Sequence, residues 1–218
     1  MNINGKTAAV GDRITPTDRI TLDGKQININ ASLPVRIRVL AYHKPPGELT
    51  TREDPQKRHT VFDNLPGIRK GKWIAVGRLD LNTSGLLLFT NNGELANRLM
   101  HPSSKVEREY AVRVLGRVND GMINNMLKGV ALEDGMASFI QVADAGGTGA
   151  NHWYRVTIME GRNREVRRLW ESQGVKVSRL IRIRFGNYSL PKGKRQGQFW
   201  ELSRKEVEAL YKTVKSEK

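Results

Sequence analysis

The order of strand-like and helix-like segments constrains the fold of this chain more than any other feature of its sequence. Residues 35–43 alternate apolar and basic side chains, which is typical of a half-exposed strand. Further strand and helix patterns follow without strict alternation, so we expect an α+β fold with a mainly antiparallel sheet flanked by helices. The expected strands are 35–43, 73–79, 85–90, 107–115, 153–159, 177–185 and 198–202, and the expected helices are 92–99, 119–128, 162–173 and 203–215.

The first 32 residues differ from the rest of the chain. They contain "INGK" and "LDGK", in which Gly follows Asn or Asp as it does in tight β-hairpins. A segment of this size cannot bury a core of its own. We therefore expect a small β element at 1–32 and one larger domain at 33–218, with an exposed hairpin or loop at 143–153.

The charge balance narrows the class of partner. Lys and Arg number 37 against 22 Asp and Glu, a formal net charge of +15, and such a chain favours a polyanion, RNA or DNA first. No apolar run approaches the roughly 20 residues of a membrane span, and the first residues lack a signal-peptide pattern. The chain has no cysteine, and its four histidines lack ligand spacing. We expect a cytoplasmic protein with no metal site and no membrane partner.

The positive charge is concentrated between Arg162 and Arg184, where eight Lys or Arg accompany two Glu. The strand expected at 177–185 would project several arginines from one side. Like charges repel unless an anion offsets them, so we expect this cluster to bind nucleic acid, although a merely solvated basic surface is the alternative. In the helix expected at 162–173, the residues spaced to share a face are Arg164, Arg167, Arg168 and Glu171, and the apolar stripe is Val166, Leu169 and Trp170.

One carboxylate stands on a loop between two apolar segments of this basic chain. Asp80 precedes the turn-type residues 82–85, and a turn or N-cap role would by itself explain it. The alternative is a nucleophile or general base, because carboxylates form covalent intermediates at sugar carbons. In that role Asp80 must be ionised, which a nearby arginine would favour through charge attraction and paired hydrogen bonds.

Three motifs resemble those of the RsuA/RluB/RluE/RluF family of pseudouridine synthases. The first is "GRLDLNTSGLLLFTNNGELANRLMHP" at 77–102, the second is "KVEREYAV" at 105–112, and the third is "EGRNREVRRLWESQGVKVSRLIRIRFGNYSLP" at 160–191. The resemblance extends from about Arg38 to Leu202 and implies the pseudouridine synthase fold. It also implies an isomerase that converts a uridine in RNA to pseudouridine without a cofactor or metal.

The resemblance further implies the roles of individual residues. Asp80 would act at the ribose, as a nucleophile at C1′ or as the base that yields a glycal. Tyr110 would pack on the target base, and Arg167 would pair with Asp80. Without the motifs, Tyr110 would be interpreted as a core residue of the sheet. The implied substrate contacts are Arg78, which would help to displace the nucleotide, Leu180, which would pack on the base unless it is only a core residue, and Thr83, Asn163 and Arg164.

Two N-terminal segments of the sequence lead to the remaining expectations. The loop "HKPPGELTTREDPQKRHTVFDNLP" at 43–66 is similar to that of members acting on large-subunit ribosomal RNA, so we expect this RNA or its assembly precursor as partner of a monomer. A tRNA substrate and a non-catalytic RNA-binding or ribosome-assembly protein are the alternatives. Residues 1–32 resemble only the last part of the S4 RNA-binding domain with which family members usually begin, so that domain is either truncated or naturally incomplete.

Overall fold

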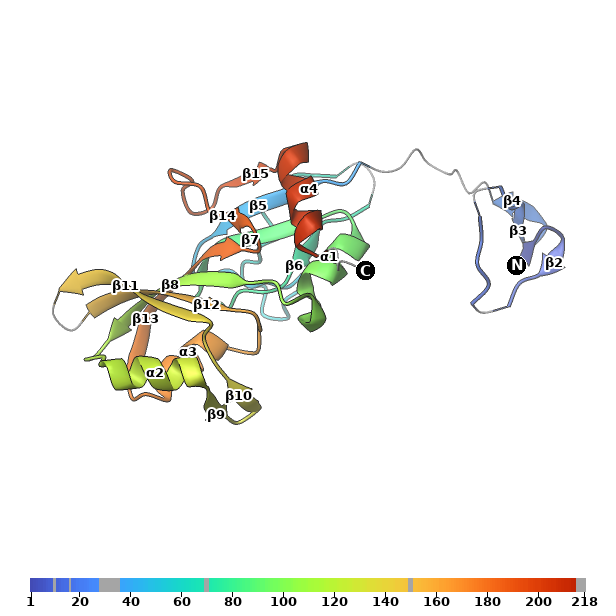
Figure 1. Ribbon diagram of the computed structural model, residues 1–218. Coiled ribbons are helices and arrows are strands. Elements are labelled where there is room, and N and C mark those ends of the chain that lie inside the picture. Colours follow the sequence, from blue (N-terminus) through green and yellow to red (C-terminus); the bar gives the residue numbers. More distant parts are fainter. Residues whose placement is uncertain (10, 16, 28–35, 69–70, 149–150, 215–218) are drawn as a thin grey trace. The chain divides into compact units, whose positions relative to one another are not determined.

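The computed structural model describes residues 1–9, 11–15, 17–27, 36–68, 71–148 and 151–214. The chain forms two compact units, Met1–Arg36 and Ile37–Lys218, each of which is described separately (Figure 1). The boundary predicted between residues 32 and 33 lies outside the described residues.

The first unit contains a small antiparallel sheet with the strand order β2-β1-β3-β4 among its described residues. Asn4 and Gly5 adopt positive φ angles in one hairpin, and Asp23 and Gly24 do so in the other, as their sequences predict. Among the described residues of this unit, Ile20 is the buried apolar side chain. The likeness of this unit to part of an S4 domain remains a prediction. The strands are β1 (Asn2–Ile3), β2 (Lys6–Thr7), β3 (Ile20–Leu22) and β4 (Lys25–Ile27).

The second unit is built on one large sheet, which runs in the order β11-β12-β8-β13-β7-β5-β15 with β14 paired to β13 and β6 paired to β7 (Figure 1). Of the described strand pairs in this sheet, β13 with β7 is parallel and the others are antiparallel. The predicted α+β class with a mainly antiparallel sheet is confirmed. The strands are β5 (Val39–Lys44), β6 (Ile74–Val76), β7 (Ser84–Thr90), β8 (Arg108–Leu115), β11 (Gln141–Thr148), β12 (Asn151–Ile158), β13 (Lys176–Phe185), β14 (Tyr188–Ser189) and β15 (Phe199–Glu201).

The helices lie close to the predicted positions, and their first turns explain why. Asn92, Asn119 and Ser203 each cap a helix by accepting a hydrogen bond from a backbone N–H three residues later. None of the helices in the described part of the chain is long and apolar enough to cross a membrane. The α-helices are α1 (Gly93–Met100), α2 (Asp120–Lys128), α3 (Glu165–Glu171) and α4 (Arg204–Thr213), and a 3-10 turn, η1, covers Pro102–Ser104.

Strand β7 lies between β13 and β5 and is buried along its whole length. Leu87 and Phe89 belong to one cluster of buried side chains, whereas Leu86 and Leu88 belong to another. A strand covered on both faces has a continuous apolar sequence, which is the pattern of residues 86–89. The turn of residues 80–83 therefore leads directly into a strand that is packed on both faces.

Gly85 allows β7 and β13 to approach each other at the start of their parallel pairing. Its φ angle is +106°, and a Cβ atom placed there would lie 2.3 Å from the backbone oxygen of Arg182. No other residue type fits this position without moving one of the two strands. Gly85 of the first motif thus allows the turn that contains Asp80 to lie beside strand β13 of the third motif.

Candidate functional site

A cleft of about 1350 Å³ opens between the three motifs. The predicted site residues that line it are Arg78, Asp80, Thr83, Tyr110, Asn163, Arg164 and Leu180. Arg167 is the one predicted site residue that does not line it. Segments separated by more than a hundred residues in the sequence therefore meet at one cavity.

Asp80 occupies the first position of the turn that leads into β7. The turn is closed by a hydrogen bond of 3.0 Å from the Thr83 N–H to the Asp80 backbone oxygen. The side chain is half-buried, and its carboxylate has no hydrogen-bond or ion-pair partner among the described residues. The Thr83 hydroxyl is also buried without a described partner. The carboxylate at the cleft is thus available to a ligand.

Lys44 holds the Asp80 turn in place, which the sequence analysis did not predict. Its side chain is fully buried at the end of β5, and its Nζ donates hydrogen bonds to the backbone oxygens of Asp80 (3.2 Å), Leu81 (3.4 Å) and Thr83 (3.0 Å). Burial lowers the pKa of Lys44 to about 8, against the opposing charges of Glu48 and Asp80. A single lysine that follows an alternating strand carries no local signal of this role.

Arg167 does not form the expected ion pair with Asp80. Its Nη2 donates to the backbone oxygen of Asn82 (2.9 Å) and its Nη1 to that of Val177 (3.0 Å), and no ion pair joins Arg167 to Asp80 in the described part of the chain. Burial, with the repulsion of Arg164, lowers the pKa of Arg167, and the charge of Asp80 opposes this shift. Arg167 therefore acts on Asp80 at longer range and fixes the turn through its backbone.

Tyr110 and Leu180 lie at the inner side of the cleft on the neighbouring strands β8 and β13. Both are buried, at 7% and 5% exposure, and both belong to the main hydrophobic cluster. They line the cleft as well, so the core and binding interpretations of each residue are compatible. An apolar surface at this position can receive the face of a flat, unsaturated ring.

Arg182 lies beneath the cleft, where it stands opposite Tyr110 in the β8–β13 register. It is 1% exposed, its Nε donates to the Leu86 backbone oxygen (2.7 Å), and its Nη2 has no partner among the described residues. Burial lowers the pKa of Arg182, and the neighbouring Tyr110 hydroxyl opposes that shift. The prediction that the strand arginines project from one side is wrong at Arg182, because this side chain points into the interior.

The basic helix is shorter than predicted, and its arginines do not all share the partners that one face would give them. Helix α3 begins at Glu165, because Arg164 has a φ angle of +48° and precedes the first turn. The arginines then take different partners: Arg164 lies 3.6 Å from Glu171, whereas Arg168 forms a two-fold hydrogen bond of 2.8 Å with Asp134. Exposed Arg78 and Asn163 contribute to the cleft lining as predicted, from either side of it.

Carboxylates neutralise much of the basic cluster. Asp134 lies in the turn between β9 (Val130–Leu132) and β10 (Gly135–Ala137), a hairpin that the sequence analysis missed. It pairs with Arg168, whose hydrogen bonds lower the pKa of Asp134 to about 2, and also with Arg162. Arg162 also contacts Glu160, and Arg184 lies between Glu107 and Glu109. These arginines are therefore already held in ion pairs and do not form a free basic surface.

The chemical capacity of the cleft follows from these contacts. No group of His, Asp and Glu side chains able to hold a metal ion occurs among the described residues. The cleft instead combines an unpartnered carboxylate, an aromatic ring and buried cations that stabilise negative charge. Such a site can attack an electrophilic carbon or remove a proton from a substrate with a flat ring.

Comparison with known proteins identifies the family of this chain. The family model described as RNA pseudouridylate synthase matches residues 38–172. The chain belongs to the RNA pseudouridylate synthase family. It is 56% identical over 216 residues to a ribosomal large subunit pseudouridine synthase B of Haemophilus influenzae, covering 98% of this chain and 60% of that protein. The same identity and coverage of this chain are found with the protein of that name from Escherichia coli K12, of which 74% is covered.

The fold comparison agrees with this membership. A crystal structure of a pseudouridylate synthase superimposes with a TM-score of 0.71 at 23% identity and covers 96% of this chain and 87% of that chain. The predicted pseudouridine synthase fold is confirmed. The chain spans between three fifths and three quarters of the length of the two curated relatives described above.

Proposed function

We propose that this protein isomerises a specific uridine of large-subunit ribosomal RNA to pseudouridine. The observation that carries the proposal is the half-buried, unpartnered carboxylate of Asp80 at a cleft lined by Tyr110 and Leu180. The two relatives that are 56% identical to the chain over 216 residues are named for this reaction and this subunit. The RNA substrate comes from those names and not from the geometry.

The reaction requires one bond to break and one to form at the same carbon. Asp80 acts at the ribose, either by attacking C1′ or by taking the proton from C2′ to yield a glycal, and the N1–C1′ bond breaks in both routes. The uracil turns within the cleft, and C5 forms a bond to C1′ as the bond between Asp80 and C1′ breaks or, in the glycal route, as C2′ regains its proton. C5 loses a proton and N1 gains one, so the isomerisation needs no oxidant, reductant or co-reactant.

Tyr110 and Leu180 receive the detached base in this proposal. A base inside helical RNA is out of reach, and turning it out of the stack costs a few kcal/mol. Packing against an aromatic ring offsets part of this cost. Arg78, which is exposed at the cleft, fills the place that the nucleotide leaves, while Thr83, Asn163 and Arg164 contact the nucleotide or its phosphates.

Lys44 and Arg167 prepare the carboxylate. The two cations bind the backbone oxygens of residues 80–83, so the turn cannot relax when RNA phosphates approach. Their positive charge also offsets the repulsion between the Asp80 carboxylate and the phosphates of a polyanion. We also propose that the protein acts as a monomer, and sedimentation of the protein with and without RNA tests that state.

The direct test is to map pseudouridines in ribosomal RNA from cells with and without the gene. Loss of one modification in the large subunit, and its restoration on an unmodified transcript by the purified protein, is the expected result. A transcript with cytidine at that position is the matched control. Unchanged maps together with an inactive purified protein would contradict the proposal and favour a non-catalytic RNA-binding role.

A further inference from the structure

The loop that connects β14 to β15, residues 191–198, carries three cations that the rest of the protein does not neutralise. Lys192, Lys194 and Arg195 are all exposed, and none of them pairs with a carboxylate in the described part of the chain. We call residues 191–198 the basic loop. Its charges contrast with those of Arg162, Arg168 and Arg184 in the arginine-rich region of residues 160–184, each of which has an acidic partner.

Hydrogen bonds to strand β5 hold the basic loop in one conformation. The Gly197 N–H donates to the His43 backbone oxygen (2.8 Å), and the His43 N–H donates to the Gln198 backbone oxygen (2.9 Å). The His43 ring lies 2.8 Å from the Lys194 backbone oxygen. A loop anchored in this way presents its cations with little loss of conformational freedom on binding.

The same anchoring places the basic loop close to the proposed catalytic turn. His43, which binds the loop, is followed by Lys44, whose ammonium group binds the Asp80 turn. Adjacent Cα atoms lie about 3.8 Å apart. The loop and the turn therefore meet the same end of β5, within the distance that a few nucleotides span.

Aromatic side chains lie near the basic loop: Phe199 follows it directly in the sequence, and Trp200 contacts Lys194. Phe199, the first residue of β15, is 40% exposed at the edge of the sheet. Lys194 lies 5.0 Å from the ring of Trp200, which in turn donates a hydrogen bond of 2.8 Å to the Tyr188 hydroxyl. An exposed ring next to unpaired cations is typical of surfaces that hold single-stranded nucleic acid, because a base stacks on the ring and phosphates contact the charges.

We propose that the basic loop and Phe199 form a second RNA contact surface, which binds the backbone flanking the nucleotide in the cleft. This inference rests on the proposed function for the identity of the polyanion. It assigns most of the phosphate contacts to the loop rather than to the arginine-rich region that the sequence analysis favoured. The ion pairs of that region are already formed, and phosphates would have to displace carboxylates from them.

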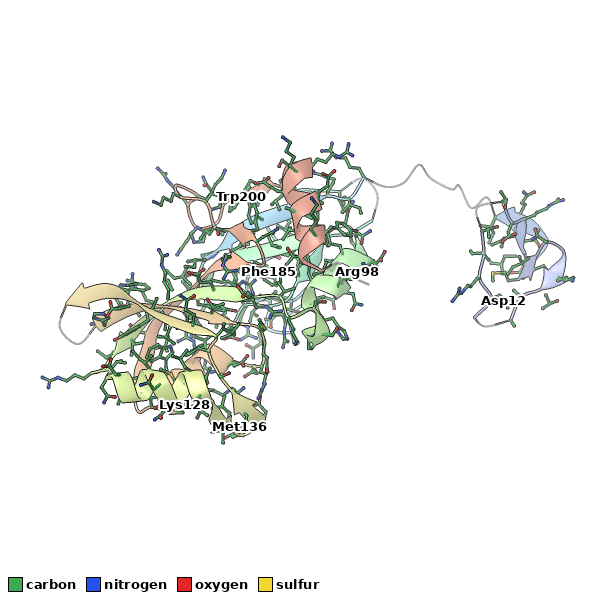
Figure 2. All side chains as sticks on the ribbon, viewed as in Figure 1. Asp12, Arg98, Lys128, Met136, Phe185 and Trp200 are labelled. Carbon is green, nitrogen blue, oxygen red and sulfur yellow. The ribbon has the colours of Figure 1, made fainter. Side chains whose placement is uncertain are left out.

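The test compares two triple variants that remove the same charge. The first is Lys192→Gln, Lys194→Gln and Arg195→Gln. The matched control is Arg117→Gln, Lys128→Gln and Lys176→Gln, which changes exposed cations without a described acidic partner outside the cleft. Figure 2 shows Lys128 at the opposite end of the unit from Trp200. Filter binding of a ribosomal RNA fragment, from about 50 to about 200 mM salt, measures the dependence of affinity on salt.

We expect the loop variant to lower the slope of log affinity against log salt by about 2 to 3, and the control to leave it nearly unchanged. The single-turnover rate at saturating RNA should be equal in both variants and the unmodified protein. Phe199→Leu should weaken binding by about tenfold without changing the slope, because it removes a ring and no charge.

Three outcomes would overturn the inference. Equal slope changes in the two triple variants would show an effect of net charge alone. Unchanged slopes in both would show that the loop is only solvated. A lower saturated rate with unchanged affinity would show that the loop supports the active site. The inference and the proposed function fail separately: if the unmodified protein makes no pseudouridine but the slopes differ as expected, the RNA surface stands and the reaction does not.

Discussion

Two basic regions of the second unit, residues 160–184 and the basic loop, differ in what their charged side chains contact. Apart from the exposed Arg179, the arginines of residues 160–184 contact carboxylates or backbone oxygens, as Arg168 does with Asp134 and Arg167 does with Asn82. In the basic loop of residues 191–198, Lys192 and Arg195 have no acidic partner among the described residues. Residues 160–184 hold more positive charge than the basic loop, but fewer of their cations are free to bind an anion.

The difference follows from the side chains and their surroundings. The planar guanidinium group forms several directed hydrogen bonds at once, which suits it to join strands, turns and hairpins within a protein. The loop cations project from a short segment with glycines at 193 and 197, and none of them pairs with a carboxylate among the described residues. We therefore expect changes near the cleft to alter rate or stability, and changes in the loop to alter salt-dependent binding.

The largest effect is expected for Asp80→Asn. The amide has the same shape but cannot act as nucleophile or base, so the single-turnover rate should fall by at least about a thousandfold. Affinity for RNA should stay equal or rise slightly, since a negative charge is removed. Pseudouridine formation on the ribosomal RNA fragment and filter binding measure the two quantities. A near-normal rate would remove Asp80 from the proposed mechanism.

Arg167→Lys should come next. One ammonium group cannot reach both the Asn82 and the Val177 backbone oxygens, so the turn should loosen although the charge is kept. We expect the saturated rate to fall by about a hundredfold, with an unchanged salt slope. Arg179→Lys, at an exposed position of β13, is the control. Lost affinity with a normal rate would instead make Arg167 a phosphate contact.

The pH dependence of Lys44 gives a smaller effect. Burial lowers the pKa of Lys44 from 10.5 to about 8. As the pH rises through 8, the hydrogen bonds from Lys44 to the Asp80 turn should therefore weaken, and the single-turnover rate should decline. Between these values the unfolded chain holds the Lys44 proton and the folded chain does not, so the contribution of this group to stability increases with pH. A falling rate with undiminished stability would thus separate a local change from unfolding.

Lys44→Met supplies the control for that profile. The variant should be slower than the unmodified protein at pH 7, because the carbonyl groups of the turn lose their donor. Its rate should no longer decline near pH 8. If the decline persists in the variant, another group causes it.

The smallest effect is expected for Arg168→Gln. Arg168 is already paired with Asp134 in a partly exposed position, at 22% and 42% side-chain exposure. Its loss should lower the free energy of unfolding by about 0.5 to 1 kcal/mol, and should not change the salt slope of RNA binding. Thermal unfolding and filter binding measure the two. A slope change as large as that of the loop variant would show that RNA displaces the ion pair.

Much of the architecture could be predicted because it depends on neighbours in the sequence. The helices begin at Asn92, Asn119 and Ser203, whose side chains cap backbone groups three residues away. The apolar run at 86–89 indicates a buried strand, and the hairpin glycines of the first unit indicate its turns. The motifs likewise led to Asp80, Tyr110 and Leu180, which all line the cleft, although their roles remain predictions.

The partners of the charged side chains could not be predicted in this way. Arg167 binds Asn82 across 85 residues, Arg168 binds Asp134 across 34, and Lys44 reaches Thr83 across 39. Such contacts depend on strand register and on the close approach of β7 and β13 at Gly85, which no local pattern encodes. The sequence by itself determined the elements, the family motifs and the excess of positive charge. Only the tertiary structure decided which cations are buried, which are paired and which face the solvent, because ion pairing requires two groups to meet in space.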